Sequence, residues 1–473
     1  MQPSTTSDFW QLKVASPLVQ VACTDGQGRS LTYYELNAWV DEVSQALTAQ
    51  GLRQLGFLFS TNSLEWLCVY LACIRAGHVP LLLPSDLESS LAEQLIDTYQ
   101  PAWVWYPPSP QADSEDGGKW TASMLAAFAW REPTTSATLH PDLGLLLSTS
   151  GSTGSPKLVR LSYRALSTNA SSIASYLNIQ AQDRAMTTLP PNYSFGLSVI
   201  NSHLAVGASL VMHNASLMSR DFLRIVQQEE VTALAGVPTW YQMLLRTGFD
   251  KAEIPSLRVL TQAGGRLDER TKRAVLNFAQ AKGLRFYVMY GQTEAAPRIS
   301  YVPPEALPDK LNSIGIPIPG GSLELDSETA ELIYTGPNVM MGYAESQSDL
   351  AKGDELNGVL RTGDIGSVDA EGFYAITGRL KRFVKLSGNR YGLDEIEVQL
   401  TSLAKSNVAV AGRDERMGIW IEGTDLDLQA LVKAFLQEKY GLHHTLFRVH
   451  LVPTLPLLPT GKKDYTNMMQ QLG

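Results

Sequence analysis

Residues 56–84 contain two short apolar runs on either side of an apolar-rich segment with a helix cap. The runs are GFLFS at 56–60 and HVPLLLP at 78–84, and the segment between them, LEWLCVYLACIRAG, follows the capping residues Asn62 and Ser63. Parallel strands need a crossover of a dozen or more residues, usually a helix. The segment therefore predicts the strand, helix and strand of a parallel sheet, and an α/β fold.

The same alternation recurs further along the chain. An apolar run at 143–150 is followed by a Gly/Ser/Thr loop and by a helical segment over 163–177. Later apolar runs are separated by helical stretches such as DERTKRAVLNFAQAKG, and in chain order they read SLVMH, TALAGV, LRVLTQAG and RFYVMYG. Doubly wound sheets fit this order best.

Two other N-terminal segments have a clear local pattern. A capping box at 32–35, followed by apolar residues at helical spacing, predicts a helix over 32–50. The segment 107–142 is rich in Pro, Ser, Asp and Gly. It breaks the alternation and predicts a surface excursion, with one helical patch over 121–130.

The C-terminal part of the chain has a different texture. From about residue 317 the apolar runs become shorter and turns more frequent, which predicts a small barrel or antiparallel patch. After residue 378, a helix over about 427–440 and short strands predict a small α+β domain. We therefore expect a large N-terminal domain over 1–377, with doubly wound sheets and a β-barrel-like subdomain, and a small mobile C-terminal lid domain over 378–473.

The composition limits the partners. The chain of 473 residues has 38 Lys+Arg against 47 Asp+Glu, a formal net charge of −9. An acidic balance without a long basic run argues against nucleic acid as a partner.

The N-terminus lacks a signal-peptide pattern and no apolar stretch is long enough for a membrane span, so we expect a soluble, cytoplasmic protein. Cys23, Cys68 and Cys73 form no CxxC pair and are expected to be buried free thiols.

Residues 148–157, STSGSTGSPK, have the composition of a phosphate-binding loop. Glycines free the backbone to present N–H groups, hydroxyls add donors, and Lys157 supplies a positive charge. The segment is not a Walker A sequence, because Lys157 follows Pro156 and precedes Leu158. Taken alone, such a loop after a strand is also typical of an ordinary flexible connection. Whether it binds phosphate therefore depends on the other motifs of the chain.

Four further motifs follow. YGQTE at 290–294 closes an apolar strand, and ligands of open α/β sheets bind at such carboxyl ends. RTGD at 361–364 places a carboxylate on a tight turn, where it can accept hydrogen bonds from ribose hydroxyls. GRLKRFVK at 378–385 and PTGK at 459–462 place basic residues beside glycines. Each motif alone has an ordinary interpretation as a turn or a solvated surface.

In this order the motifs resemble the adenylate-forming superfamily of acyl-CoA synthetases, amino-acid adenylation domains and luciferases, from about residue 31 to the end. The resemblance implies a two-step reaction, in which a carboxylate and ATP give an acyl-adenylate and pyrophosphate, and a thiol then displaces AMP. It implies ATP and Mg²⁺ as cofactors and a small carboxylic acid as substrate. It also implies CoA, or the phosphopantetheine of an acyl or peptidyl carrier protein, as acceptor.

The resemblance assigns the polyphosphate to residues on two motifs. It implies that Thr293 contacts the α-phosphate and that Glu294 ligates Mg²⁺, a hard cation that prefers oxygen ligands. The loop that matches STSGSTGSPK would cradle the β- and γ-phosphates. Its predicted binding residues are Ser150, Gly151, Ser152, Thr153, Gly154 and Lys157.

The nucleoside is assigned in the same way. The resemblance implies that Asp364 holds the ribose hydroxyls and that Arg379 holds ribose or phosphate oxygens with its donor fork. The positions that match the adenine pocket and its motif are Gly264, Gly265, Tyr290 and Gly291.

Lys462 matches the catalytic lysine of the superfamily, whose ammonium neutralises charge between the substrate carboxylate and the α-phosphate. Lys463 is the adjacent alternative, but the family pattern places the lysine directly after the glycine. The family rotates its C-terminal domain between half-reactions, about a hinge that corresponds to Lys381, and presents a loop near Gly388 to the thiol. The lid is shorter than expected over 399–459, where the acceptor usually docks, and this argues against free CoA more than it argues against adenylation.

The segment 191–198, PNYSFGLS, matches the start of the acyl-pocket helix. Amino-acid-activating members usually carry an acidic residue where this chain has Gly196, so an α-amino acid is disfavoured. Tyr193 replaces a histidine that is frequent in acyl-CoA synthetases, and could equally be core. Arg298 could pair with a second anionic group on the acid, or form a structural ion pair. The predicted substrate residues are Tyr193, Phe195, Gly196, Val237, Pro238, Ala295 and Arg298.

Three functions remain open on these grounds. The first is an acid–thiol ligase that loads CoA or a carrier protein. The second is a freestanding adenylation enzyme that passes the acyl group to an amine, a hydroxyl or a carrier. The third is a non-catalytic nucleotide-binding relative, against which Glu294, Asp364 and Lys462 argue. His203 has no partner at a metal-binding spacing and is interpreted as a structural or surface residue.

Overall fold

The protein is described by a computed structural model. The described residues are 8–12, 19–51, 53–108, 117–131, 138–148, 157–380, 382–386, 389–413, 415–458 and 461–472. The chain divides into two compact units. The first comprises 1–311, 317–322 and 335–360, and the second comprises 312–316, 323–334 and 361–473. The predicted boundary at 377/378 falls inside the second unit and stays a prediction.

The first unit contains a nine-stranded sheet in the order β15-β14-β13-β12-β11-β9-β10-β1-β2. Its strands β1 and β9 to β13 pair in parallel, whereas β2 and β14 run antiparallel to their neighbours. The later apolar runs of the sequence are therefore parallel strands, as predicted. The bounds are β1 (Val21–Thr24), β2 (Ser30–Thr32), β9 (Arg184–Met186), β10 (Ser209–Val211), β11 (Ala233–Gly236), β12 (Val259–Gln262), β13 (Arg285–Gly291), β14 (Arg298–Val302) and β15 (Ile316–Pro317).

A seven-stranded sheet in the same unit has the order β18-β8-β7-β4-β3-β5-β6. The predicted parallel crossover is confirmed, because β3 and β4 pair in parallel with Leu55 opposite Val79, and a helix lies between them in the chain. The bounds are β3 (Leu55–Ser60), β4 (Val79–Pro84), β5 (Trp103–Trp105), β6 (Phe128–Trp130), β7 (Leu143–Ser148), β8 (Leu158–Ser162) and β18 (Gly342–Ala344).

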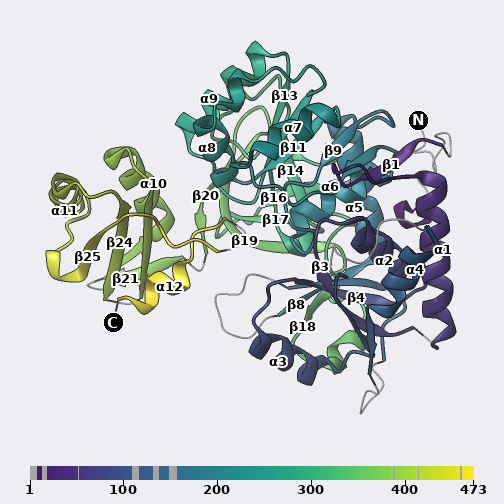
Figure 1. Ribbon diagram of the computed structural model, residues 1–473. Helices are drawn as coiled ribbons and strands as arrows, with labels where there is room; N and C mark the ends of the chain where they lie inside the picture. The colour runs from purple at the N-terminus through teal and green to yellow at the C-terminus, as the bar shows by residue number, and fades with distance from the viewer. Residues whose placement is uncertain are drawn as a thin grey trace. The chain divides into compact units, whose positions relative to one another are not determined.

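Helices cover both faces of the seven-stranded sheet (Figure 1). One face packs against α1, α2, α5 and α6, and the other packs against α3, since alternate residues of each strand enter different core clusters. The bounds are α1 (Tyr33–Ala49), α2 (Leu64–Arg75), α3 (Ser89–Tyr99), α4 (Gly117–Ala126), α5 (Tyr163–Leu177), α6 (Ser194–Leu204), α7 (Arg220–Gln228), α8 (Pro238–Arg246) and α9 (Glu269–Ala281). The capping box predicted at Thr32 and Glu35 starts α1.

The helical patch predicted over 121–130 is wrong in its second half. Helix α4 ends at Ala126, and residues Phe128–Trp130 form strand β6, antiparallel to β5. Phe128 packs edge-on against Trp103, with ring centroids 5.4 Å apart. Aromatic residues suit a strand when a neighbouring strand offers such a partner, and that partner is not visible in the local sequence.

The second unit begins with a four-stranded sheet in the order β16-β17-β19-β20, where the sequence predicts a small barrel or antiparallel patch. Strands β19 and β20 pair antiparallel. The bounds are β16 (Ser322–Leu325), β17 (Glu331–Thr335), β19 (Val359–Val368) and β20 (Tyr374–Arg379). The α/β fold class with an additional small β subdomain is therefore confirmed.

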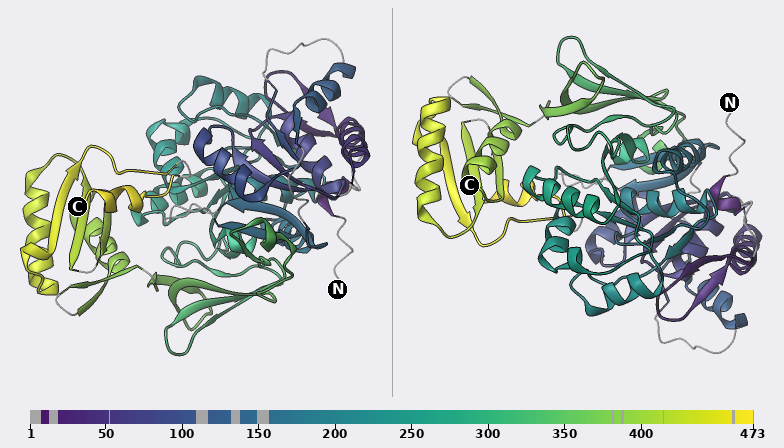
Figure 2. Two further views of the ribbon diagram at one scale, coloured as in Figure 1. Left: turned by 90° about the horizontal axis from the view of Figure 1, so that it is seen from below. Right: turned by 90° about the horizontal axis from the view of Figure 1, so that it is seen from above.

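The C-terminal part of the second unit is α+β, with a three-stranded sheet in the order β23-β24-β25. Val408 and Val410 face helices α10 and α11, whereas Ala409 and Ala411 face α12. Figure 2 shows α11 lying along this sheet in both views. The bounds are β21 (Phe383–Leu386), β22 (Asn389–Gly392), β23 (Val408–Arg413), β24 (Arg416–Glu422), β25 (Phe447–Val452), α10 (Leu393–Ala404), α11 (Leu426–Tyr440) and α12 (Tyr465–Gln470). The sequence predicts helix α11 but neither α10 nor α12.

Two further predictions concern the cysteines and membrane spans. Cys23, Cys68 and Cys73 are buried free thiols, as predicted, and burial raises the pKa of each. Within the ranges that the structure describes, no helix has the length and apolar character that crossing a bilayer requires.

Candidate active site

The predicted phosphate loop joins two antiparallel strands. Ser148 at the end of β7 pairs with Leu158 at the start of β8. The expected order of strand, loop and helix is therefore wrong, because β8 intervenes before α5. Residues 158–162 form a strand because they pair between β7 and β18, where most of their side chains are buried. The predicted binding residues Ser150, Gly151, Ser152, Thr153 and Gly154 lie outside the described residues.

Lys157 and Glu294 each interact with the same tyrosine, Tyr343 of β18. The Lys157 ammonium lies 5.8 Å from the centre of the Tyr343 ring and 2.6 Å from a carboxylate oxygen of Glu345. The Tyr343 hydroxyl donates to Glu294 Oε1 at 2.8 Å. Burial and the charge of Glu294 raise the pKa of Tyr343, so the hydroxyl keeps its proton. The structure thus joins the phosphate-loop lysine to the YGQTE carboxylate through a residue that no motif indicated.

The YGQTE motif begins at the carboxyl end of β13 and continues into a short 3₁₀ turn, Thr293–Ala295. Thr293 Oγ1 lies 3.1 Å from Ser194 Oγ at the start of α6. Gln292 Nε2 donates to the Tyr290 hydroxyl at 3.2 Å. The motif therefore positions the Thr293 hydroxyl beside the first residue of α6, the helix that is predicted to line the acyl pocket.

Residues predicted for the adenine pocket and for the acyl pocket lie together. Gly264 has φ +83°, and a Cβ atom there would lie 2.4 Å from Tyr193 Oη and 3.1 Å from Val237 Cγ1. At Gly265 a Cβ atom would lie 3.3 Å from Pro238 Cγ. Glycine is required at 264 by both its conformation and this close approach. Burial raises the pKa of Tyr193 to about 12.

The structure gives a packing reason for Gly196. A Cβ atom at this position would lie 2.4 Å from the carbonyl oxygen of Pro190. Any larger residue, including an acidic one, would displace that backbone. Ala295 is fully buried, and its carbonyl oxygen accepts a hydrogen bond from Asn338 at 2.6 Å. Neighbouring protein groups lie close to Gly196 and Ala295 and explain their small size. Their size is therefore not by itself evidence of space for an acid.

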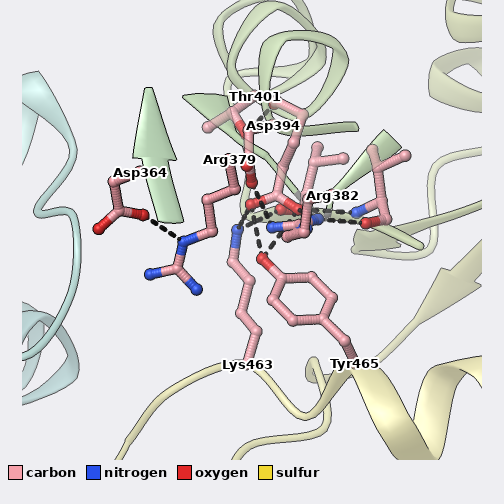
Figure 3. A network of polar contacts seen from close by, with 10 residues as sticks. Asp364, Arg379, Arg382, Asp394, Thr401, Lys463 and Tyr465 are labelled. Atoms are coloured by element: carbon pink, nitrogen blue, oxygen red, sulfur yellow. Dashed lines mark hydrogen bonds and ion pairs between the residues drawn. The ribbon is translucent and has the colours of Figure 1, made fainter. Parts of the chain in front are cut away.

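Asp364 and Arg379 face each other across β19 and β20 (Figure 3). Arg379 Nε donates to Asp364 Oδ1 at 2.8 Å. Asp364 is 1% exposed, whereas the Arg379 side chain is 58% exposed. The expected tight turn at Asp364 is wrong, since the residue lies inside a strand that continues to Val368. Antiparallel pairing holds the carboxylate and guanidinium predicted for the nucleoside as one unit.

Lys462 and Lys463 have different surroundings. Lys463 Nζ donates to Glu397 Oε1 at 2.7 Å and to the Val408 carbonyl at 2.6 Å, so its ammonium is engaged by groups of its own unit. Lys462 is exposed, on a turn in which Leu458 N donates to the Lys462 carbonyl at 2.7 Å. Among the two lysines, Lys462 is therefore the one that can reach a ligand. Its catalytic role stays a prediction.

A polar network surrounds Glu397 of α10, and Figure 3 shows Arg382, Lys463 and Tyr465 pointing toward one another there. Arg382 pairs with Asp394 and with Glu397, and its guanidinium lies 3.9 Å from the centre of the Tyr465 ring. Burial alone would raise the pKa of Glu397, but Lys463 and Arg382 hold it below its ordinary value. Lys381, the predicted hinge, and Gly388 lie outside the described residues.

Arg298 starts β14 and is 2% exposed. Its guanidinium lies 4.6 Å from the centre of the Phe195 ring, and Nη2 donates to Ser198 Oγ at 3.0 Å. One of the two interpretations of Arg298 is a structural ion pair. Within the described ranges no carboxylate pairs with Arg298, so this ion pair is not found there. Arg298 and Phe195 line one pocket, and Tyr193, Gly196, Val237, Pro238 and Ala295 do not line it.

Comparison with known proteins identifies the family. The AMP-binding enzyme family matches residues 11–344. The indoleacetate–CoA ligase of Aromatoleum aromaticum is 30% identical over 476 residues, 92% of each chain. A feruloyl-CoA synthase of an Amycolatopsis species is 27% identical over 96% of each chain. The chain belongs to the AMP-binding enzyme family, and the predicted enzyme class, an AMP-forming acid–thiol ligase, is confirmed.

Solved structures agree on the fold. The o-succinylbenzoate CoA synthetase from Bacillus subtilis, in complex with its acyl-adenylate intermediate, has a TM-score of 0.76 at 22% identity, over 97% of each chain. ATP-bound MatB from Rhodopseudomonas palustris has a TM-score of 0.77 at 24% identity, over 98% of each chain. At these identities the likeness concerns the fold.

Proposed function

We propose that the protein activates a small carboxylic acid with ATP, forms an acyl-adenylate, and transfers the acyl group to the thiol of CoA. The observation that carries this proposal is the contact of Lys157 and Glu294 with Tyr343, which gathers a cation and a carboxylate beside Thr293. The relatives that span most of this chain are named as CoA ligases and synthases, which supports CoA as the acceptor.

The residues fit magnesium and a polyphosphate. Glu294 offers a carboxylate, the ligand type Mg²⁺ prefers, and no group of three or more His, Cys, Asp or Glu competes for a metal in the described part of the chain. Magnesium held by Glu294 would neutralise negative charge on the phosphates. Lys157 and the loop 150–154 would hold the terminal phosphates, and Thr293 the α-phosphate. Tyr343 orients Glu294 by donating to Oε1.

The ribose and the transition state would be held by residues of the second unit. Asp364 accepts from Arg379, and because a carboxylate can accept several hydrogen bonds, it can also accept from ribose. The exposed guanidinium of Arg379 can reach ribose or phosphate. Gly264, Gly265, Tyr290 and Gly291 would form the adenine pocket. Lys462 would neutralise the charge that develops between the acid and the α-phosphate.

The acceptor is the finer part of the proposal. We place the hinge at Lys381 and the thiol entrance near Gly388, with domains over 1–377 and 378–473, as the superfamily resemblance implies. Free CoA is the acceptor that the curated relatives favour. A carrier-protein phosphopantetheine is the alternative, because the segment 399–459 is shorter than expected.

Pyrophosphate exchange tests the first half-reaction. The full chain is incubated with ATP, Mg²⁺ and a panel of aryl and alkyl carboxylic acids, and incorporation of labelled pyrophosphate into ATP is measured. Mass spectrometry with CoA and with a holo carrier protein then identifies the acceptor. Exchange with an acid, followed by its CoA thioester, supports the proposal. Adenylate without a thioester favours an amine or hydroxyl acceptor, and no exchange with any acid favours a non-catalytic relative.

A further inference from the structure

The first unit contains a pocket between helices α5 and α6 and strands β9 and β11 to β14. The empty space between these elements, counting the part open to solvent, is about 490 Å³. Most lining side chains are apolar. The polar side chains of the lining are those of Ser198, Ser202, His203, Thr261, Asp183 and Arg298.

Arg298 brings a buried positive charge to this pocket. Its Nε atom has no hydrogen-bond partner, and the residue is 2% exposed. Ser198, the Tyr176 hydroxyl and the Phe195 ring are neutral partners, so they leave the charge uncompensated. A buried charge without a counter-charge costs several kcal/mol, on the order of 3–5 when a pair is broken. An anionic ligand would remove this cost.

The other ionisable groups of the pocket do not compete for that role. Asp183 pairs with Arg258 at 3.5 Å and accepts from Gln180 N at 2.8 Å. His203 Nδ1 lies 2.8 Å from the Val199 carbonyl, which makes Nδ1 the donor and leaves Nε2 as an acceptor without a partner. Burial lowers the pKa of His203, so the ring is neutral. Arg298 is therefore the group that attracts an anion.

Helix α6 contacts both Arg298 and Thr293, and so it relates the positions of these two residues. Ser194, in its first turn, lies 3.1 Å from Thr293, the predicted α-phosphate contact. Ser198, four residues later, accepts from Arg298. At 1.5 Å per residue, these two positions are about 6 Å apart along the helix. Strand pairing places Gly291 of the YGQTE motif opposite Arg298, so the two sites are held by one piece of sheet.

We infer that Arg298 selects a carboxylic acid with a second anionic group, a dicarboxylic acid whose distal carboxylate binds Arg298 while its other carboxylate is adenylated. This inference rests on the proposed function and specifies its substrate class. The guanidinium would offer Nε and Nη donors to the distal carboxylate, in the bidentate geometry that Arg and carboxylates favour. Ser198, already bonded to Nη2, holds the fork in place.

Matched pairs of acids test the inference by pyrophosphate exchange. The pairs are octanoate with octanedioate, and 3-phenylpropanoate with 3-(4-carboxyphenyl)propanoate. For the wild type we expect kcat/KM to be at least about 10-fold higher for the diacid of at least one pair. Arg298→Met should raise the KM for that diacid by about 100-fold and leave the matched monoacid within about threefold. Arg298→Lys should restore part of the preference.

Arg285→Met is the matched control, because Arg285 donates to the Leu177 carbonyl and does not line the pocket. It should keep the wild-type preference. Circular dichroism of each variant separates misfolding from lost recognition. If Arg298→Met changes both acids of a pair equally, or if the wild type prefers monoacids, the inference is wrong and the proposed function stands.

A binding measurement covers the remaining case. If no acid supports exchange, the proposed function fails, and calorimetric titration with octanedioate and octanoate decides the pocket's ligand. Wild-type binding of octanedioate that Arg298→Met abolishes would support Arg298 as the anion partner. Equal binding of both acids, or of neither, would overturn it.

Discussion

Two arginines, one in each unit, lie over aromatic rings but differ in their other partners. Arg298 is buried and Arg382 is partly buried. The Arg298 guanidinium is 4.6 Å from the Phe195 ring centre, and that of Arg382 is 3.9 Å from the Tyr465 ring centre. Arg382 also pairs with two carboxylates of α10. Arg298 pairs with no carboxylate among the residues that the structure describes. The protein thus neutralises the charge of Arg382 and leaves that of Arg298 uncompensated.

This difference separates structure from recognition. A buried charge that protein groups neutralise is costly to disturb, whereas one that they leave uncompensated adds little stability and is available to a ligand. The network around Arg382 should therefore respond to mutation mainly through stability. The site around Arg298 should respond mainly through substrate binding.

The largest expected effect on stability is that of Glu397→Leu. The change leaves Arg382 and Lys463 without their shared carboxylate, and breaking such buried pairs costs about 3–5 kcal/mol. Urea unfolding of the full chain, followed by circular dichroism, measures the loss. Glu395→Leu is the matched control, since Glu395 is exposed on the same helix, and it should stay within about 0.5 kcal/mol. Equal losses in both variants would contradict a structural role for Glu397.

Lys462→Ala should have the largest effect on activity without a comparable effect on folding. Loss of one placed donor at developing charge lowers the rate by about 10²–10³-fold. Pyrophosphate exchange should fall by at least this factor, while conversion of a preformed acyl-adenylate to the thioester continues. Lys463→Ala provides the comparison, and should lower stability more than Lys462→Ala, because Lys463 is bonded to Glu397 and Val408. Near-wild-type exchange by Lys462→Ala would refute its assignment.

The motifs predicted the local framework of the site. YGQTE closes β13 because its apolar run RFYVM is a strand, and PNYSFGLS starts α6 at Ser194. The family resemblance favours Lys462 over Lys463, and the structure places Lys463 in the Glu397 network. These features depend on residues that are near one another in the chain.

The features that were missed depend on contacts between distant residues. Tyr343 lies 49 positions after Glu294, outside every motif, yet it bonds to that carboxylate. RTGD looked like a turn, but pairing with β20 makes Asp364 part of a strand. Strand β8 was missed because its neighbours β7 and β18 bury it, and one of those neighbours is far along the chain. Local patterns cannot contain such partners.

Another buried cation, Lys272 of α9, extends the comparison. It is 5% exposed and donates to the Leu311 carbonyl, and burial lowers its pKa from 10.5 to about 8. Between these values the unfolded chain binds more protons than the folded one, so stability should rise with pH, by about 3 kcal/mol at most. Urea unfolding from pH 7 to 10 should show this rise in the wild type and not in Lys272→Met. Lys251→Met, at an exposed site, should keep the rise.

The smallest expected effect on stability is that of Arg298→Met. The change removes a buried charge that no carboxylate in the described part of the chain compensates, at the loss of the hydrogen bonds to Ser198 and Tyr176 and of one cation–π contact. These terms nearly cancel, so the free energy of unfolding should stay within about 1 kcal/mol of the wild type or increase. Arg285→Met, which removes the bonds to the Leu177 carbonyl and to Tyr287, serves as the control. A loss of more than about 3 kcal/mol would show that the protein already satisfies Arg298, and the two arginines would then both be structural.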